Sequence, residues 1–240
     1  MKNALRLLTA ALAFASGCAE TPTQPLAGTP APVQAPTGSQ APTPTPPPIP
    51  TPSSVEALFR SIADGDFDTF SRFINDGVHV STRNTLGETL LYVAAEKGQL
   101  EIAKLLIAKG ADAKALTPNG ETVLHAASMI ESSALMTALI EAGADVNAAN
   151  RDEETPLHWA ALTGTFLAVK ALADAGADLN VQDTRTGNTP LHAAVSHDDI
   201  ALVHYLLSKN ARTDIRNNAG VTALEFAKSR GRGSVKLFER

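Results

Sequence analysis

The sequence predicts an all-α solenoid that follows a disordered linker: about six helix-turn-helix units joined by extended hairpin fingers. Two repeating features indicate it. Five similar phrases begin with threonines spaced 33, 33, 34 and 33 residues apart, and a phrase related to Gly-Ala-Asp recurs about 21 residues after most of these threonines. The threonines are Thr89, Thr122, Thr155, Thr189 and Thr222. Each unit would expose an apolar face that only its neighbours can cover, so we expect the units to be stable as an array.

Each threonine marks the expected start of a first helix. Threonine is a competent N-cap, and a proline directly after it suits the first helical position, where no amide donor is needed. After Thr155, the residues Leu157, Ala160 and Ala161 follow at helical spacing, with alanines that allow close helix packing. A second apolar helix follows in each unit, as in residues 202–207, and a left-handed glycine normally ends it.

The phrase Thr155-Pro-Leu-His-Trp-Ala-Ala, repeated at a period of 33, resembles the ankyrin repeat. The resemblance covers roughly residues 54–240 and implies that the first and last units act as caps. The expected units are 54–84, 85–116, 117–150, 151–183, 184–217 and 218–240. The basic residues of the last unit suit a solvated outer end, although a basic docking patch is the alternative; they are Lys228, Arg230, Arg232 and Lys236.

Four positions depart from the ankyrin pattern. Glu153 stands where a finger glycine is expected, and Asn210 replaces the glycine that ends a second helix. Glu131 and Asp198 replace the glycine that normally turns the first helix into the second. Asparagine is the next best left-handed residue after glycine. We therefore expect altered loop geometry but an intact fold, with an unusual start of the second helix near residues 131–133.

Residues 1–17 are typical of a secretory signal peptide. Lys2 and Arg6 precede a short apolar core, and small residues follow it. The last four residues, 15–18, resemble the lipobox of bacterial lipoproteins, although Ala15 stands where leucine is usual. The resemblance implies lipid attachment at Cys18 and an outer-membrane lipoprotein that faces the periplasm. The alternative is ordinary signal cleavage, which would leave a soluble periplasmic protein.

Residues 18–53 are expected to form a Pro/Thr-rich disordered linker, anchored by the lipid. Twelve of the chain's 15 prolines lie between Pro22 and Pro52, and residues 21–55 contain no charge. Proline removes amide donors, and the segment offers almost nothing apolar to bury. It would act as an extended spacer. A docking motif for a proline-recognising domain is the alternative.

Charge and cysteine content exclude several classes of site. The net charge is −5, and without residues 1–17 it becomes −7, from 18 basic and 25 acidic residues. A large nucleic-acid-binding face is therefore not expected. One cysteine makes neither an internal disulfide nor a multi-cysteine metal site. We expect a monomer that binds another protein and contacts the membrane only through its lipid.

No catalytic constellation is expected, and neither is a metal or another cofactor. The resemblance implies that His125, His158 and His192 form hydrogen bonds within and between units. A metal site at His192, His197 and His204 lacks the i, i+4 spacing of helical zinc motifs. The sequence shows no nucleophile elbow and no phosphate-binding loop.

In ankyrin proteins, partners usually contact the finger tips and the inner face of the first helices. The matching helix positions are Glu96, Lys97, Met129, Ile130, Leu162, Thr163, Ser196 and His197. The finger positions are Arg151, Asp152, Arg185, Leu86, Glu88, Thr117, Asn119 and Asn188. Met129, Ile130 and Leu162 are apolar, which indicates either an interface or inward packing in a distorted third unit. Trp159 is expected to pack in the core.

The sequence therefore predicts a non-catalytic protein-binding module tethered to the bacterial envelope, where it regulates or protects an envelope enzyme. An inhibitor or immunity protein against a toxin is an alternative within the same class. A metal-dependent enzyme and a structural spacer without a specific partner are alternatives from other classes.

Overall fold

The computed structural model describes residues 52–238, and every regular element within that range is helical. The α-helices are α1 (Pro52–Asp64), α2 (Phe67–Asn75), α3 (Leu90–Glu96), α4 (Leu100–Ala108), α5 (Val123–Ala127), α6 (Ser133–Glu141), α7 (Pro156–Thr163), α8 (Phe166–Asp174), α9 (Pro190–Ser196), α10 (Ile200–Ser208) and α11 (Ala223–Ser229). A 3₁₀ helix, η2 (Gly233–Leu237), follows them. The predicted signal peptide, Cys18 and most of the predicted linker lie outside the described residues. Helix α1 begins at Pro52, slightly before the predicted boundary of the array.

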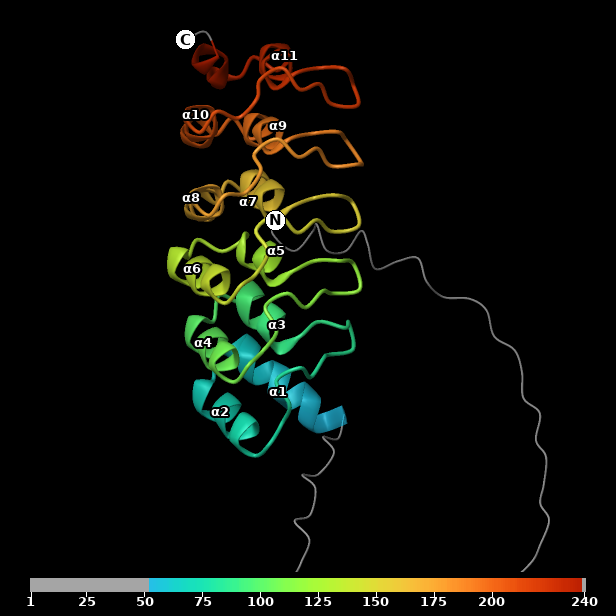
Figure 1. Ribbon diagram of the computed structural model, residues 1–240, viewed down its shortest axis with the longest axis vertical. Helices are drawn as coiled ribbons and strands as arrows, with labels where there is room; N and C mark the ends of the chain where they lie inside the picture. The colour runs from blue at the N-terminus through green and yellow to red at the C-terminus, as the bar shows by residue number, and fades with distance from the viewer. Residues whose placement is uncertain (1–51, 239–240) are drawn as a thin grey trace, which may run out of the picture. The chain divides into compact units, whose positions relative to one another are not determined.

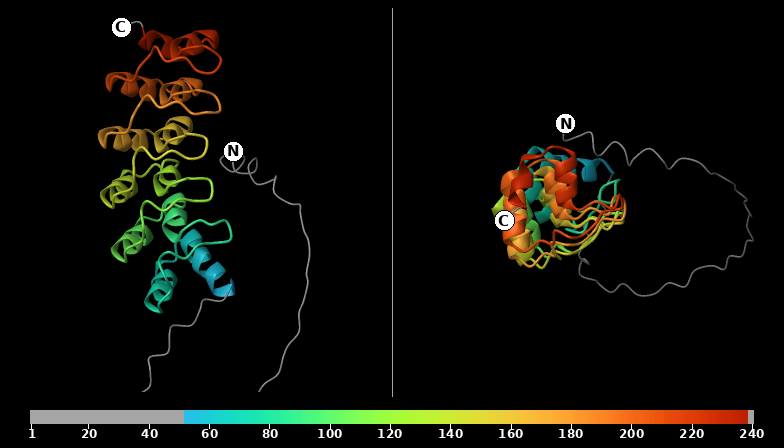
Figure 2. Two further views of the ribbon diagram at one scale, coloured as in Figure 1. Left: turned by 45° about the vertical axis from the view of Figure 1, so that its right-hand side comes forward. Right: turned by 90° about the horizontal axis from the view of Figure 1, so that it is seen from above.

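Within residues 52–238 the helices pair into six units, each an inner helix followed by an outer one. The odd-numbered helices form the inner row, and hairpin fingers extend from that row on the side away from the outer helices (Figures 1 and 2). Inner helices pack on inner helices, as α3 does on α5 and α7 on α9, and outer helix α6 packs on α8. This arrangement confirms the predicted all-α solenoid.

The inner helices begin at the repeated threonines, as the sequence predicts. The hydroxyl of Thr89 accepts a hydrogen bond from the backbone N–H of Tyr92 at 3.1 Å, which satisfies one of the free donors at the helix start. In three units a histidine returns the bond, so that His125 Nδ1 accepts from the backbone N–H of Thr122 at 3.0 Å. Pro156 begins α7 at the position where its missing donor costs nothing.

Three of the four departures from the repeat pattern adopt the backbone that glycine would supply. Glu153, Asp198 and Asn210 have φ values of 57°, 54° and 63°, and they are the non-glycine residues with positive φ in the described part of the chain. A non-glycine residue in this region costs roughly 1–2 kcal/mol. The fold therefore keeps its turn geometry at these positions. The altered loop geometry expected at Glu153 and Asp198 is wrong, whereas the left-handed backbone expected at Asn210 is confirmed.

The fourth departure changes the local structure of the third unit (α5 and α6). Glu131 does not adopt the left-handed backbone, and α5 already ends at Ala127. Ser132 instead caps α6, with φ −136° and a hydroxyl that accepts from the backbone N–H of Leu135 at 3.3 Å. The unusual helix start expected near residues 131–133 is confirmed.

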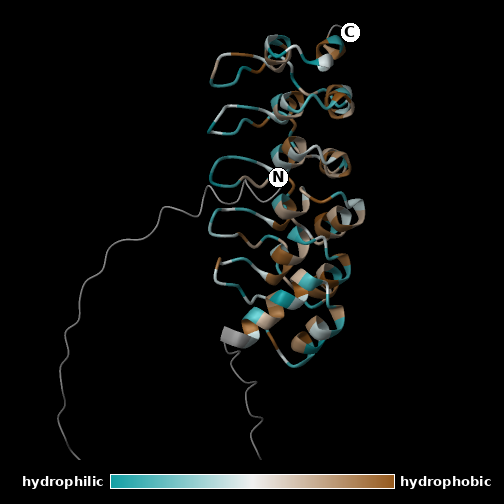
Figure 3. Cartoon of the chain, turned by 180° about the vertical axis from the view of Figure 1, so that it is seen from behind, coloured by the Kyte–Doolittle hydropathy of each residue, from teal (hydrophilic) through white to brown (hydrophobic). Residues whose placement is uncertain are grey.

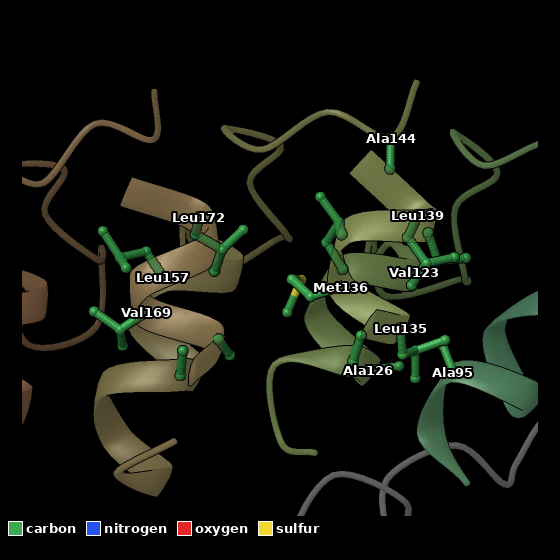
Figure 4. Packing of buried hydrophobic residues seen from close by; sticks show 14 of the residues in the cluster. Ala95, Val123, Ala126, Leu135, Met136, Leu139, Ala144, Leu157, Val169 and Leu172 are labelled. Atoms are coloured by element: carbon green, nitrogen blue, oxygen red, sulfur yellow. The ribbon is translucent and has the colours of Figure 1, made fainter. Parts of the chain in front are cut away.

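The core runs through the stack between the two rows of helices. Ala126 and Leu157 on the inner row, together with Leu135 and Val169 on the outer row, are completely buried (Figure 4). Small alanines on the inner helices allow neighbouring backbones to approach closely. Apolar residues concentrate on the helices, whereas the fingers are mostly polar (Figure 3). Between residues 52 and 238, no helix is both long and apolar enough to cross a membrane.

Candidate interaction surface

The fingers form a continuous edge along the array because neighbouring fingers are hydrogen-bonded to each other. The backbone N–H of Arg151 donates to the carbonyl of Asn119 at 3.1 Å, and that of Thr184 donates to the carbonyl of Asp152 at 3.0 Å. Side chains at successive tips are therefore held in register. We call the finger tips and the adjoining side of the inner helices the inner surface.

Two of the predicted finger residues are buried and shape the fingers. Glu88 is only 9% exposed, and its carboxylate accepts from Asn84 Nδ2 at 2.8 Å. The hydroxyl of Thr117 accepts from the backbone N–H groups of Asn119 at 3.3 Å and Glu121 at 3.1 Å. Both side chains are thus buried and hydrogen-bonded within the finger turn, and contact of Glu88 and Thr117 with a partner stays a prediction.

Other predicted finger residues face solvent. Arg151, Arg185 and Asn119 are exposed, and Leu86 is 66% exposed. Asp152 and Asn188 are half-buried. The exposed side chains of this group are accessible from solvent, and their contact with a partner stays a prediction.

The predicted helix positions lie where the inner helices end. Lys97 and His197 are exposed, and the ammonium of Lys97 lies 3.8 Å from the carboxylate of Glu96. The hydroxyls of Thr163 and Ser196 donate to carbonyls of their own helices, at 2.9 Å and 2.7 Å. Of these polar side chains, Lys97 and His197 are therefore the most available to a partner.

The three apolar residues at these helix ends divide between packing and exposure. Met129 and Ile130 are half-buried, and a Cβ atom placed on Gly98 would lie 3.2 Å from Ile130 Cγ2. Ile130 thus packs on the preceding unit. Leu162 keeps 38% of its surface exposed. Inward packing therefore holds for Ile130, whereas an interface at the exposed Leu162 stays a prediction. We call Met129, Ile130 and Leu162 the apolar cluster of the inner surface.

Trp159 is the inner-surface residue that sequence reasoning missed. We expected it in the core, but it is only half-buried. Its indole N–H donates to Glu154 Oε2 at 2.9 Å, and its ring meets His125 edge-on with ring centroids 5.3 Å apart. The matching positions in the flanking units are alanines, and such small neighbours cannot cover an indole. This difference in size between Trp159 and the matching alanines is the sequence feature that could have predicted its partial exposure.

Trp159 lies where the fourth unit (α7 and α8) meets its finger. Glu154, which accepts the indole bond, also accepts from Asn150 Nδ2 at 3.3 Å and lies 3.8 Å from Arg185 Nη2. Leu162 follows Trp159 by three residues on α7, so the two side chains are neighbours along the helix. An aromatic ring, an exposed leucine and a fixed carboxylate therefore meet on one part of the inner surface.

The repeated histidines are structural, as the resemblance implied. His125 Nε2 donates to the carbonyl of Glu154 in the next unit at 2.9 Å, and His158 and His192 donate in the same way at 3.2 Å. Burial lowers the pKa of His125 to about 4 and also lowers the pKa values of His158 and His192. Because both ring nitrogens of each neutral imidazole are hydrogen-bonded, the three histidines link neighbouring units. Over residues 52–238, no group of three or more His, Cys, Asp or Glu side chains is arranged to hold a metal ion.

The acids that replace the turn glycines cap helices in the following unit, which the sequence did not reveal. Glu131 Oε1 accepts from the backbone N–H of Leu167, in the first turn of α8, at 3.1 Å. Asp198 accepts from the N–H groups of Ser234 at 3.1 Å and Gly233 at 3.2 Å, and these bonds lower its pKa. Each acid thereby satisfies free donors one unit further along.

Comparisons with known proteins agree with this geometry. A family model described as ankyrin repeats (3 copies) matches residues 104–183 and 169–238, and another described as ankyrin repeats (many copies) matches residues 74–127. The crystal structure of the ankyrin repeat domain of Bcl-3, described as a unique member of the IkappaB protein family, is similar, with a TM-score of 0.67 and 29% sequence identity. That similarity covers 76% of this chain and 84% of the other. No curated protein matches the chain.

Proposed function

Because this chain belongs to the ankyrin-repeat family, whose models together span residues 74–238, we propose that it binds a partner protein through the inner surface of units three and four. Ankyrin repeats make the chain a protein–protein interaction module. Its role is to hold a partner and not to catalyse a reaction. We propose that it acts as a monomer, without a metal or another cofactor and without binding nucleic acid.

The observation that carries this proposal is the exposed Leu162 beside the half-buried Trp159. Met129 holds the matching position of the preceding unit and is, like Ile130 after it, apolar and half-buried, and the finger residues Arg151 and Asp152 precede α7. Apolar patches rimmed by charge favour protein interfaces, and their aromatic residues often carry much of the binding energy. Because neighbouring finger tips are hydrogen-bonded, little order would need to be gained on binding.

We further propose that the module is tethered to the bacterial envelope, on sequence grounds. The lipobox-like segment would place lipid on Cys18, and residues 18–53 would span the distance to the array. A tether near the partner raises the effective concentration, so a modest affinity would suffice. Palmitate labelling of the full chain should disappear in Cys18→Ser. Labelling that survives this substitution would contradict the lipid anchor.

Crosslinking in the native cells, followed by capture of the full chain and mass spectrometry, tests the binding proposal. We expect a partner that is recovered with the wild type and lost with Met129→Asp combined with Leu162→Asp. Thr137→Asp, at an exposed position on outer helix α6, is the control and should retain the partner. Circular dichroism checks that each variant is folded. Equal recovery with the double variant would contradict the proposed surface.

The identity of the captured partner then decides the role. An envelope enzyme whose activity or lifetime changes with the module supports regulation or protection. A toxin that loses its activity in the complex supports the inhibitor role.

A further inference from the structure

Charge is distributed unevenly along the array. Residues 117–183, which form units three and four, contain ten acidic and two basic side chains. Residues 184–238 contain four acidic and eight basic side chains. The third unit has no lysine or arginine between residues 115 and 150. Within residues 117–238, the acidic part of the array is therefore the part that carries the apolar cluster of the inner surface.

Several of these acids border the inner surface. Glu154 is hydrogen-bonded to Trp159, and Glu121, the matching residue of the third unit, accepts from the phenol of Tyr92 at 2.7 Å. Glu153, at a finger tip, is exposed, and Asp152 beside it is half-buried. Three cations lie on the same side of this part of the array: Arg151 and Arg185 on the fingers, and Lys97 where α3 ends. Arg185 already faces Glu154 at 3.8 Å, and Lys97 faces Glu96 at 3.8 Å. A partner would therefore meet a mainly negative rim.

Trp159 occupies a repeat position that holds a small, buried residue in each flanking unit. The matching residues are Ala126 in the third unit, which is fully buried, and Ala193 in the fifth, which is 9% exposed. Because both matching side chains are small, neither is large enough to cover the exposed part of the indole. Together, Trp159 and Leu162 offer a partner a single apolar anchor site.

From these observations, which rest on the function proposed above, we propose that the partner docks through a basic segment with apolar side chains. Its apolar side chains pack against Trp159 and Leu162 while its lysines or arginines face the acids of units three and four. Charge complementarity of this kind favours encounter and excludes acidic partners. Anchoring on an aromatic residue supplies affinity that charge alone would not.

Peptide titration of the full chain tests this proposal. Trp159 is the only tryptophan, so its fluorescence reports binding at this site. Three peptides of equal length serve as probes, in which leucine is combined with lysine, with glutamine or with glutamate. We expect the lysine peptide to bind most tightly and to shift the Trp159 emission. Its affinity should fall as NaCl rises from about 50 to about 300 mM.

Variants of the full chain separate charge from apolar contact. Asp152→Asn combined with Glu153→Gln should lower the affinity for the lysine peptide about threefold to tenfold, the effect expected when two charges at the rim are removed. The matched control is Glu101→Gln combined with Glu141→Gln on the outer helices α4 and α6, which should leave its affinity unchanged. Leu162→Asp should lower the affinity for the leucine–glutamine peptide about tenfold, since it removes an apolar contact.

Each result decides between distinct conclusions. If the glutamine or glutamate peptide binds as tightly as the lysine peptide and Leu162→Asp still weakens it, the preference for basic partners is wrong but the binding surface stands. If no peptide binds, a basic segment is not the ligand. Whether the inner surface binds a partner is then decided separately, by whether the Leu162→Asp variant still captures the partner recovered by crosslinking. If the chain associates with itself and Leu162→Asp abolishes this, a second copy, docked by its basic last unit, is the occupant.

Discussion

Acid should loosen the array through His125, because its imidazole must stay neutral in the folded state. Its Nδ1 accepts from the backbone N–H of Thr122 at 3.0 Å, and its Nε2 donates to the carbonyl of Glu154 at 2.9 Å. The side chain is fully buried. A proton added to Nδ1 would break the bond to Thr122 and place an uncompensated charge in the core. Protonation of this one residue therefore opposes the contact between units three and four.

The size of the effect follows from the difference between folded and unfolded pKa values. Burial lowers the pKa of His125 from 6.5 to about 4, which corresponds to about 3 kcal/mol of stability. This stability is fully present above pH 6.5, and it is lost as pH falls from 6.5 to 4, where the unfolded chain binds a proton that the folded chain does not. Burial lowers the pKa values of His158 and His192 in the same direction, so all three favour unfolding in acid.

Urea unfolding of the full chain at several pH values between 7 and 4 measures this loss, with circular dichroism and Trp159 fluorescence as probes. His125→Gln should be less stable at pH 7 by about 2 kcal/mol, because buried backbone groups lose their partners. Its stability should also fall less steeply with acid than that of the wild type. His204→Gln, at an exposed position on α10, is the control and should keep the wild-type slope. Equal slopes for His125→Gln and wild type would refute the reasoning.

Three further substitutions test the departures from the repeat pattern, each by thermal melting. Glu131→Ala should cost about 1 kcal/mol, because α8 loses the carboxylate that caps it; an unchanged melting temperature would show that the cap is not needed. Glu153→Gly should stabilise by about 1 kcal/mol, because glycine adopts a φ of 57° without strain, and destabilisation would speak against that. Asp198→Gly should give no such gain, since it relieves the same strain but removes the bonds to Gly233 and Ser234; a gain equal to that of Glu153→Gly would contradict a capping role.

Much of the fold could be predicted because its determinants are local. A threonine that caps a helix and a glycine that ends one act within a few residues, and the 33-residue period repeats them. Of the missing glycines, only Asn210 could be predicted to adopt the left-handed backbone, and Glu153 and Asp198 adopt it as well. The caps that Glu131 and Asp198 provide could not be predicted, because their partners lie 35 or 36 residues away in the next unit.

Less of the interaction surface could be predicted, because exposure depends on neighbours from other units. The repeat position of Trp159 predicts burial, yet beside the small alanines of the flanking units the indole is only half-buried. Glu88 and Thr117 lie in fingers, where exposure is usual, but both side chains are buried and hydrogen-bonded within the finger turns. Leu162 was identified correctly as an apolar residue at an exposed helix end. Whether it contacts a partner stays a prediction.

Site-specific photocrosslinking in the native cells tests that prediction most directly. A photoreactive amino acid would replace Leu162 in the full chain, and the same amino acid would replace Thr137 on the outer helix α6 in a second version. If the inner surface of units three and four binds the partner, position 162 should yield a discrete protein adduct and position 137 should not. An adduct at position 137 with none at position 162 would contradict the proposed binding surface.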